Sequence, residues 1–270
     1  MSVEIHPSAV VDPKAELGDD VVVGPFAVIG PEVTLGARCR IDAGAQVQGP
    51  TVLGEDNHVY AYACVGFAPQ DLKFEGERTT LEVGDRNQFR EHCTVHRGTA
   101  KGGGVTVVGS DNLFMVGTHI AHDCRVGHHT IFANNATLAG HVDVEDHAAI
   151  SAFSSVHQFC RVGTHAYVGG YSVITRDALP YVKTVGGKPA CYGINRIGLE
   201  RKGFDGETLA VLDRAYRILV RSKLNTSQAV ETLREELGEE PIVAGLLTFI
   251  EGSERGVIME TPRRNSGRGG

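Results

Sequence analysis

The sequence predicts an all-β protein, a parallel β-helix built from hexapeptide repeats, followed by a small helical domain at its C-terminal end. Three observations predict this fold. Hydrophobic residues, nearly all aliphatic, recur every sixth position up to Ile174, small residues precede most of them by two positions, and the period becomes helical after Asp205. A period of six fits neither an amphipathic helix nor simple strand alternation, but it fits a short strand followed by a turn.

The hexad repeat continues long enough to define a solenoid. It has 26 hydrophobic positions in three runs, which span 5–65, 83–95 and 108–174. Three hexads close one triangular coil of 18 residues, so residues 18 apart stack on neighbouring coils about 4.8 Å apart. Small residues such as Ala27 and Cys39 are expected to point inward, and glycines such as Gly24 are expected in the turns. The 26 hexads therefore predict nearly nine coils.

Two segments interrupt the repeat. Residues 66–80, with the sequence GFAPQDLKFEGERTT, are expected to form a loop thrown out of one corner of the solenoid. The second interruption covers residues 99–104 and contains three consecutive glycines. Loops that leave a rigid scaffold commonly carry function, so both segments are candidates for the functional site.

The pattern changes after Ile174. Pro180, Gly186, Gly187 and Pro189 predict a linker. Helical periodicity then predicts three helices, which begin near residues 205, 226 and 241, the last two ending near residues 238 and 252. We expect a β-helix over 1–190 with its inserted loop at about 66–80, a helical C-terminal domain over 191–262, and a disordered tail over 263–270.

Composition excludes several classes of protein. The chain has 26 Lys and Arg against 33 Asp and Glu, a net charge of −7, which argues against a nucleic-acid partner held by a basic face. No apolar run is long enough to span a membrane, and the N-terminus lacks the features of a secretory signal. We therefore expect a cytoplasmic protein. The six cysteines show no metal-binding spacing and are expected to be interior residues without disulfides.

Histidines are concentrated in one part of the repeat. Eight of the 12 lie between residues 119 and 165. The hexad register predicts that five polar residues lie near one edge over adjacent coils: His119, His122, His141, His157 and Gln158. Imidazole accepts a proton near neutral pH, and the His122-Asp123 pair suggests a base with an orienting carboxylate. Two alternatives are solvated turn histidines and a zinc site made by three histidines of neighbouring coils or subunits.

Five motifs point to a known family: QDLKF, HIAHD, AGHV, HQFC and GINRIGLERKGF. With the hexads, the sequence resembles, over nearly its whole length, the acyl-[acyl-carrier-protein]:UDP-N-acetylglucosamine O-acyltransferases of the hexapeptide-repeat family, which start lipid A biosynthesis. The resemblance implies a left-handed β-helix, a homotrimer with sites between subunits, and transfer of a 3-hydroxyacyl group from acyl carrier protein to the glucosamine 3-hydroxyl of a UDP-sugar, UDP-N-acetylglucosamine. It implies no metal and no cofactor beyond the carrier protein's phosphopantetheine.

The resemblance also assigns roles to residues. It implies that His122 is the general base, that Asp123 orients it, and that the backbone N–H of Gly140 is the oxyanion donor. It also implies that His119 and His141 contact the sugar and the acyl chain. Asp71 and Lys73, supported by Gln70, would hold the nucleotide sugar from the neighbouring subunit. His157 and Gln158 would meet the phosphates or the pantetheine arm, and Asn195 and Arg201 would bind uridine and phosphate. Gly170 falls where the family sets acyl-chain length, and its missing side chain implies a long chain.

Two positions depart from the family pattern. Ile197 replaces a glutamate, and Lys202 stands where a second arginine is common, so the choice between N-acetylglucosamine and an amino-sugar variant is left open. Basic residues crowd the C-terminal region: Arg196, Arg201, Lys202, Arg214, Arg217, Arg221 and Lys223. They suggest docking of the acidic carrier protein, with ordinary solvated helix faces as the alternative.

Four other functions compete with this prediction. The N-acyltransferase of the same pathway has an extra domain before its solenoid, whereas the hexads here begin at Ile5. An acetyl-CoA-dependent transferase would use a different acyl donor. A γ-type carbonic anhydrase would need three histidine ligands and zinc. A purely structural solenoid would not depend on His122.

Overall fold

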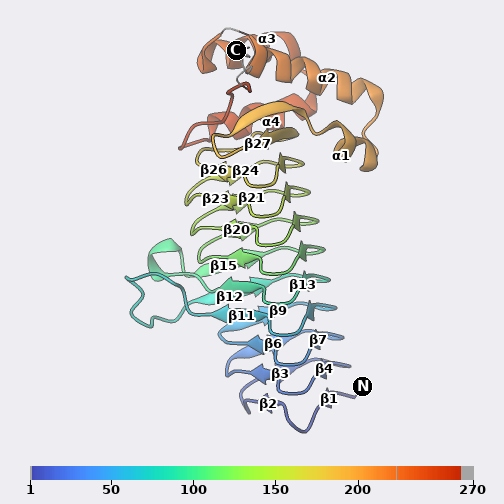
Figure 1. The fold of residues 1–270 in the computed structure, drawn as a ribbon, viewed down its shortest axis with the longest axis vertical. Coiled ribbons are helices and arrows are strands. Elements are labelled where there is room, and N and C mark those ends of the chain that lie inside the picture. Colours follow the sequence, from blue (N-terminus) through green and yellow to red (C-terminus); the bar gives the residue numbers. More distant parts are fainter. Residues whose placement is uncertain (1, 223, 263–270) are drawn as a thin grey trace, which may run out of the picture.

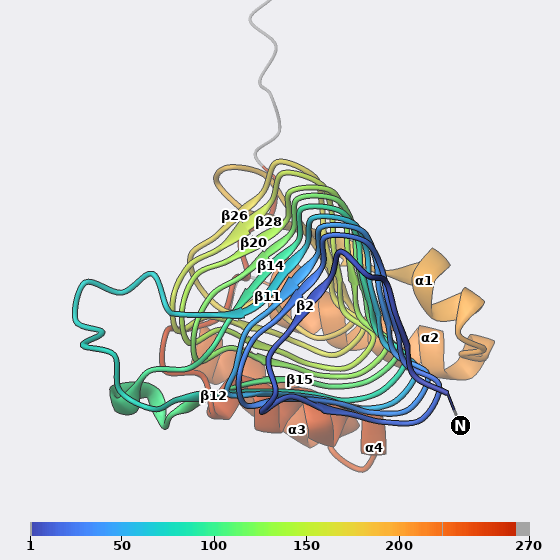
Figure 2. The ribbon, with the colours of Figure 1, turned by 90° about the horizontal axis from the view of Figure 1, so that it is seen from below.

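The computed structural model describes residues 2–222 and 224–262. Short strands stack into a three-sided prism, with the helices gathered at its C-terminal end (Figure 1). Seen along its axis, the prism has a triangular outline, and one loop projects far from one corner (Figure 2). The chain passes in turn through a first, a second and a third parallel sheet, so each regular coil contributes one strand to each sheet.

The strands of the prism are short, and most contain two residues. The first sheet contains β1 (Glu4–Ile5), β4 (Val22–Val23), β7 (Arg40–Ile41), β10 (His58–Val59), β13 (Gln88–Phe89), β16 (Leu113–Phe114), β19 (Ile131–Phe132), β22 (Ala149–Ile150) and β25 (Tyr167–Val168). The second contains β2 (Val10–Val11), β5 (Val28–Ile29), β8 (Gln46–Val47), β11 (Cys64–Phe67), β14 (Thr94–His96), β17 (His119–Ile120), β20 (Thr137–Leu138), β23 (Ser155–Val156) and β26 (Val173–Ile174). The third contains β3 (Glu16–Leu17), β6 (Val33–Leu35), β9 (Thr51–Leu53), β12 (Thr80–Val83), β15 (Val105–Val108), β18 (Arg125–Val126), β21 (Asp143–Val144) and β24 (Arg161–Val162).

The hexad register predicted from sequence is confirmed by the strand pairing. Ile120 pairs with Leu138, and Leu138 pairs with Val156, each 18 residues further on. The two interruptions lengthen single coils without changing the inward face. The inward-facing residues still pair on either side of each interruption: Leu53 pairs with Val83 across the loop, and Val83 pairs with Val108 across residues 99–104.

Aliphatic and aromatic side chains fill the prism. Phe89, Phe114 and Phe132 stack along its axis with ring centroids 5.0 and 5.1 Å apart and are fully buried. Ile5 also belongs to the inward row but is 46% exposed, because no coil lies beneath the first one. The corners turn through left-handed residues such as Asp123 and His141, with φ of 59° and 61°.

Residues 180–194 differ from the predicted linker. They contain an antiparallel pair, β27 (Val182–Val185) and β28 (Ala190–Ile194), and β27 extends the first sheet by pairing with β25. The hairpin turns at Gly186, whose φ of 114° favours glycine. The prolines and glycines that predicted a linker therefore flank and connect two strands, and β28 crosses residue 190, where the β-helix was expected to end.

Helices close the C-terminal end of the prism. They are α1 (Arg196–Arg201), α2 (Gly206–Tyr216), which continues into the π-helical turn η2 (Arg217–Arg221), α3 (Thr226–Leu237) and α4 (Pro241–Glu251). Helices α2, α3 and α4 begin where the helical period predicts, and Asp205 and Asn225 cap α2 and α3. The short α1 carries too few apolar positions to show a period. The expected disordered tail, 263–270, lies outside the described residues.

Among the described residues, no helix is long and apolar enough to cross a membrane. All six cysteines are free thiols; five are buried, as expected of interior residues, and Cys64 is partly exposed.

Candidate active site

Most of the predicted site residues lie along one edge of the prism. We call it the 2–3 edge, where the chain passes from the second sheet to the third. His122 and Asp123 lie between β17 and β18, His141 lies between β20 and β21, and His157 lies between β23 and β24. Both interruptions of the repeat also leave the prism at this edge. The inserted loop connects β11 to β12 over residues 68–79, because residues 66, 67 and 80 of the expected loop belong to these strands. Residues 97–104, with the turn η1 (Ala100–Gly102), connect β14 to β15.

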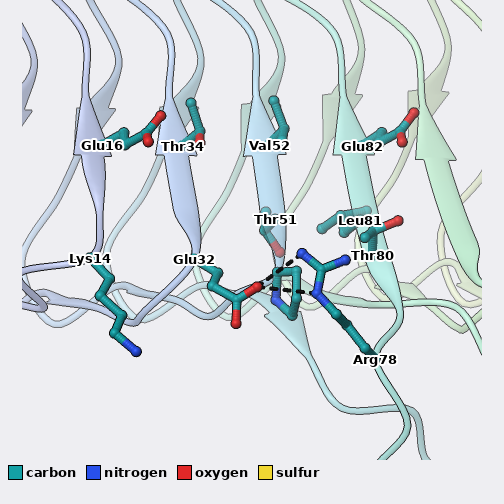
Figure 3. A pocket seen from close by; sticks show the side chains of 11 residues that line it. Lys14, Glu16, Glu32, Thr34, Thr51, Val52, Arg78, Thr80, Leu81 and Glu82 are labelled. Atoms are coloured by element: carbon teal, nitrogen blue, oxygen red, sulfur yellow. Dashed lines mark hydrogen bonds and ion pairs between the residues drawn. The ribbon is translucent and has the colours of Figure 1, made fainter.

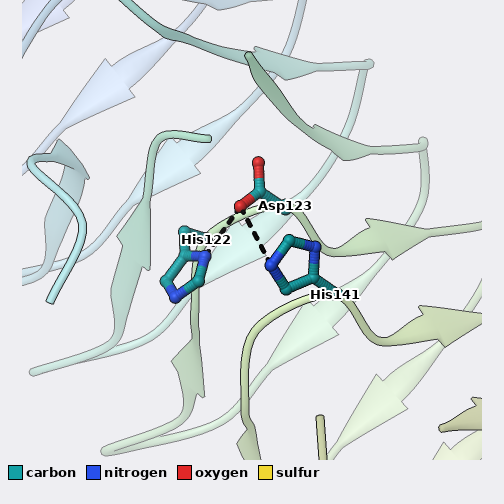
Figure 4. Close-up of side chains that lie close together, drawn as sticks. All are labelled: His122, Asp123 and His141. Atoms are coloured by element: carbon teal, nitrogen blue, oxygen red, sulfur yellow. Dashed lines mark hydrogen bonds and ion pairs between the residues drawn. The ribbon is translucent and has the colours of Figure 1, made fainter. Parts of the chain in front are cut away.

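His122 and Asp123 form a hydrogen-bonded pair at this edge (Figure 4). Their Nδ1 and Oδ2 atoms are 2.7 Å apart, because the left-handed backbone at Asp123 turns the two neighbouring side chains toward each other. The Asp123 side chain is 1% exposed, whereas 15% of the His122 side chain reaches solvent. Within the described residues, Nε2 of His122 makes no hydrogen bond. An ionised Asp123 accepts only, so His122 carries its proton on Nδ1 and Nε2 is free to accept one.

Asp123 is held from the other side by Thr99. The backbone N–H of Thr99 donates to Oδ1 and its hydroxyl donates to Oδ2, both at 2.7 Å. The N–H of Asp123 itself donates to Oγ1 of Thr106 at 2.8 Å. The sequence marked residues 99–104 as a candidate segment but gave no reason to single out Thr99, because its contact with Asp123 spans 24 positions.

Gly140 lies directly against the His122 ring. A Cβ atom added at Gly140 would be 2.5 Å from Cε1 of His122, so the ring packs on bare backbone. The Gly140 N–H donates no hydrogen bond to any described residue. A free backbone N–H beside a base is the type of group that stabilises an oxyanion.

His141 and His119 surround the pair. The His141 ring lies edge-on to His122 with centroids 5.3 Å apart, its Nε2 is 3.5 Å from Asp123, and it stacks on Phe159 at 4.6 Å. Nδ1 of His119 is 2.7 Å from the Thr94 hydroxyl. His119 lies next to a histidine that sequence reasoning missed, His96.

His96 and His119 are neutral neighbours of the site. Their rings meet edge to face at 5.0 Å. Burial lowers the pKa of His96 to about 4, and burial together with His122 lowers the pKa of His119. Both are therefore uncharged at neutral pH and add no positive charge beside His122.

The inserted loop lies beside the same edge. Asp71 accepts a hydrogen bond from the Lys73 N–H at 2.9 Å, and both residues line a cavity of about 530 Å³ that also borders Thr99 and Lys101. Gln70 and Leu72 are exposed. A second cavity, of about 310 Å³, lies at the base of the loop, where Arg78 pairs with Glu32 at 2.9 Å (Figure 3). Asp71 and Lys73 thus lie at the same edge of one chain as His122.

Asn195 and Arg201 lie elsewhere, at the edge between the third and first sheets, which we call the 3–1 edge. They line a cavity of about 660 Å³ together with Ile197, Lys202 and His165. The Asn195 side chain donates to the carbonyl of His165 at 3.1 Å. Gly170 lies between β25 and β26 and is exposed at the third edge, between the first and second sheets. One chain therefore does not bring these residues to His122.

The cluster His122, Asp123 and His141 contains three potential metal ligands, whose donor atoms lie within 4.8 Å of one another. Two ligands of a tetrahedral zinc ion lie roughly 3.3 Å apart, given its usual bond lengths. The 2.7 Å separation between His122 and Asp123 is instead that of a hydrogen bond, and Thr99 already donates to both carboxylate oxygens. The arrangement fits a base and its carboxylate better than a metal site.

The basic residues of the C-terminal helices are partly neutralised. Arg214 pairs with Glu236, Arg217 with Asp213 at 3.0 Å, and Arg196 with Glu200 at 3.9 Å. Arg201 and Lys202 are exposed and line the cavity at the 3–1 edge. Lys223 lies outside the described residues.

Comparison with known proteins agrees with the resemblance. A family model described as "Udp N-acetylglucosamine O-acyltransferase; Domain 2" matches residues 177–258. The chain is 48% identical over 254 residues to an acyl-[acyl-carrier-protein]–UDP-N-acetylglucosamine O-acyltransferase of Halorhodospira halophila, covering 94% of this chain and 98% of that protein. It is 46% identical over 258 residues to one of Stenotrophomonas maltophilia, covering 94% and 97%.

Solved structures give the same result for the fold. The UDP-N-acetylglucosamine acyltransferase of Francisella novicida superposes with a TM-score of 0.92 at 35% identity, covering 96% of this chain and 95% of that one. The O-acyltransferase of Moraxella catarrhalis gives 0.91 at 40% identity, covering 94% and 99%. The predicted left-handed β-helix with C-terminal helices is thereby confirmed. The chain belongs to the family of acyl-[acyl-carrier-protein]–UDP-N-acetylglucosamine O-acyltransferases.

Proposed function

We propose that this enzyme transfers a 3-hydroxyacyl chain from acyl carrier protein to the 3-hydroxyl of UDP-N-acetylglucosamine, the first step of lipid A biosynthesis, with His122 as general base. The names of its relatives support both substrates. The observation that carries the chemistry is the 2.7 Å contact from buried Asp123 to Nδ1 of His122, which leaves Nε2 free to accept a proton.

The reaction follows from this geometry. Nε2 of His122 takes the proton of the sugar hydroxyl as its oxygen attacks the thioester carbon, and Asp123 stabilises the resulting imidazolium. The N–H of Gly140 donates to the oxyanion, a contribution typically worth about 2.7–4 kcal/mol. Collapse of the intermediate breaks the C–S bond, and His122 returns the proton to the departing phosphopantetheine thiolate. These steps use a base, a carboxylate and a backbone donor, and we propose no resident metal or cofactor.

We propose that the working enzyme is a homotrimer. The base His122, the uridine and phosphate contacts Asn195 and Arg201, and the chain-length position Gly170 lie on three different edges of one prism. A threefold arrangement that sets the 2–3 edge of one chain against the first-sheet face of its neighbour, which lies between the other two edges, completes each site from two chains. In this arrangement Asn195 and Arg201 of one subunit bind uridine and phosphate beside His122 of the next.

The remaining substrate contacts follow the same arrangement. We infer that His119 and His141 contact the sugar and the start of the acyl chain, and that His157 and Gln158, both exposed on the 2–3 edge, meet the phosphates or the pantetheine arm. The resemblance implies that Asp71 and Lys73 hold the nucleotide sugar from the neighbouring subunit, but both border the cavity beside Thr99 of their own chain. We therefore infer that Asp71 and Lys73, supported by Gln70, hold the sugar beside His122 of the same chain.

The exposed cations Arg201 and Lys202 are suited to the acidic carrier protein and to phosphate. With this soluble donor, we expect the protein to act in the cytoplasm.

One assay tests the proposed function. Purified protein is incubated with a panel of acyl carrier proteins that bear 3-hydroxyacyl chains of different lengths, with acetyl-CoA as the rival donor, and with UDP-N-acetylglucosamine or its amino-sugar variant as acceptor. We expect a product heavier than the acceptor by one 3-hydroxyacyl group, formed only with the carrier-protein donors. Turnover with acetyl-CoA alone would contradict the proposal.

Replacing Gly170 with methionine is expected to shift the preferred donor toward shorter chains. An ideal Cβ at Gly170 meets only the Ala152 carbonyl oxygen, at 3.4 Å, so its own chain accepts a side chain there and the new bulk projects outward. The measurement is the relative kcat/KM over the donor panel. Gly187→Met is the matched control, because a Cβ there meets no atom within 4 Å. An unchanged chain-length profile in Gly170→Met would refute the proposed role.

A further inference from the structure

We propose that Thr99 is a positioning residue of the catalytic pair, which fixes the Asp123 carboxylate so that it holds His122 in the productive orientation and tautomer. The inference rests on the proposed function, because it assigns Thr99 a part in the same reaction. Thr99 borders the cavity that Asp71 and Lys73 line, but its N–H and its hydroxyl both donate to Asp123. Its proposed action is therefore through Asp123, with both donors used on that carboxylate.

The geometry of Thr99 is that of a two-point clamp. Its N–H and its hydroxyl donate to the two different oxygens of one carboxylate, each at 2.7 Å. Thr99 is itself 4% exposed, so both contacts are shielded from water. A carboxylate held at both oxygens cannot rotate about its Cβ–Cγ bond without losing a hydrogen bond.

The direction of the Thr99 hydroxyl is set by its surroundings. Gly102 donates its N–H to Oγ1 of Thr99 at 3.2 Å, so the hydroxyl oxygen acts as acceptor there and its hydrogen points toward Asp123. Asp123 therefore receives a proton donor from Thr99 and a second from Nδ1 of His122 on the same oxygen, Oδ2. This arrangement requires the His122 tautomer that leaves Nε2 unprotonated.

The turn around Thr99 is shaped to this contact. The carbonyl of Thr99 accepts hydrogen bonds from the N–H groups of Gly102 and Gly104 at 3.0 and 2.8 Å. A Cβ atom at Gly102 would lie 2.0 Å from Cγ of Asp123, so only glycine allows the turn to close on the carboxylate. The turn at residues 99–104 thus closes over the buried Asp123 carboxylate.

The same turn is connected to the inserted loop. The N–H of Ala100 donates to Oε1 of Glu77 at 3.3 Å, and Thr99 and Asp71 border one cavity. The clamp on Asp123 therefore lies between the base and the loop that carries Asp71 and Lys73.

Thr130 provides a matched control elsewhere in the fold. Its N–H and its hydroxyl both donate to Oδ1 of Asn112, each at 2.7 Å, and it is fully buried at the 3–1 edge. Replacing Thr130 with valine removes the same kind of hydrogen bond as replacing Thr99, without touching Asp123.

The experiment compares kcat and KM of Thr99→Val, Thr99→Ser and Thr130→Val, with thermal unfolding of each. We expect Thr99→Val to lose at least about tenfold in kcat with KM changed by less than about threefold, because the lost hydrogen bond acts on the base and not on substrate binding. Thr99→Ser, which keeps the hydroxyl, and Thr130→Val are expected to keep wild-type kcat within about threefold. Near-wild-type kcat in a folded Thr99→Val would overturn the proposal.

A second comparison separates positioning from general structure. In an Asp123→Ala background, adding Thr99→Val is expected to cost less than about twofold further in kcat, because the clamp has lost its target. A full tenfold further loss would show that Thr99 acts through another route and would overturn the inference. Wild-type turnover in Asp123→Ala alone would contradict the catalytic pair of the proposed function. That result is distinct from a failure of the Thr99 inference, which would appear as normal kcat in Thr99→Val while Asp123→Ala is impaired.

Discussion

Replacing His122 with alanine is expected to lower kcat at least about 100-fold, the typical contribution of a general base. The variant removes the ring that we propose accepts the sugar proton, while Asp123 keeps its two hydrogen bonds from Thr99. The His122 side chain is at a turn and outside the packed core, so the prism is expected to stay folded and the assembly intact. The measurement is single-turnover and steady-state acyl transfer, with light scattering for the assembly.

The control for this variant is His92→Ala. His92 is an exposed histidine at the edge between the first and second sheets, where it stacks on Tyr62 at 5.7 Å. It is expected to keep wild-type turnover, because none of the proposed catalytic or substrate contacts involves His92. Wild-type kcat in His122→Ala would remove the base from the mechanism and favour a purely structural solenoid.

The β-helix could be predicted from the sequence because a single physical constraint repeats 26 times. Each coil must place a hydrophobic side chain inward at every sixth residue, so counting alone stacks Ile120, Leu138 and Val156. The same count locates His122 and His141 at one edge of adjacent coils, where their rings lie 5.3 Å apart. Residues tied to a regular repeat can therefore be placed without coordinates.

Features outside the repeat could not be predicted in this way. The contact of Thr99 with Asp123 depends on how a glycine-rich turn closes over a corner, and no period describes that turn. The hairpin of β27 and β28 carries prolines and glycines that indicate a linker, and only its pairing with β25 shows a sheet. The six-residue helix α1 is too short for a helical period.

Mixing two impaired chains is expected to restore activity. His122 and Arg201 lie on different edges of one prism, so we propose that each site takes His122 from one subunit and Arg201 from its neighbour. A trimer of His122→Ala lacks the proposed base in every site. A trimer of Arg201→Ala lacks a proposed phosphate contact in every site, which lowers its activity most at low UDP-N-acetylglucosamine. In a mixed trimer, one pair of neighbours combines an intact His122 with an intact Arg201, so about one third of the sites are complete.

The decisive measurement is therefore acyl transfer by trimers that contain both variants, co-expressed with two different tags and purified through each tag in turn. At low UDP-N-acetylglucosamine, we expect about one third of wild-type activity from two chains that are each nearly inactive alone. Mixed trimers no more active than the better of the two parents would contradict a site shared between the edges of neighbouring subunits.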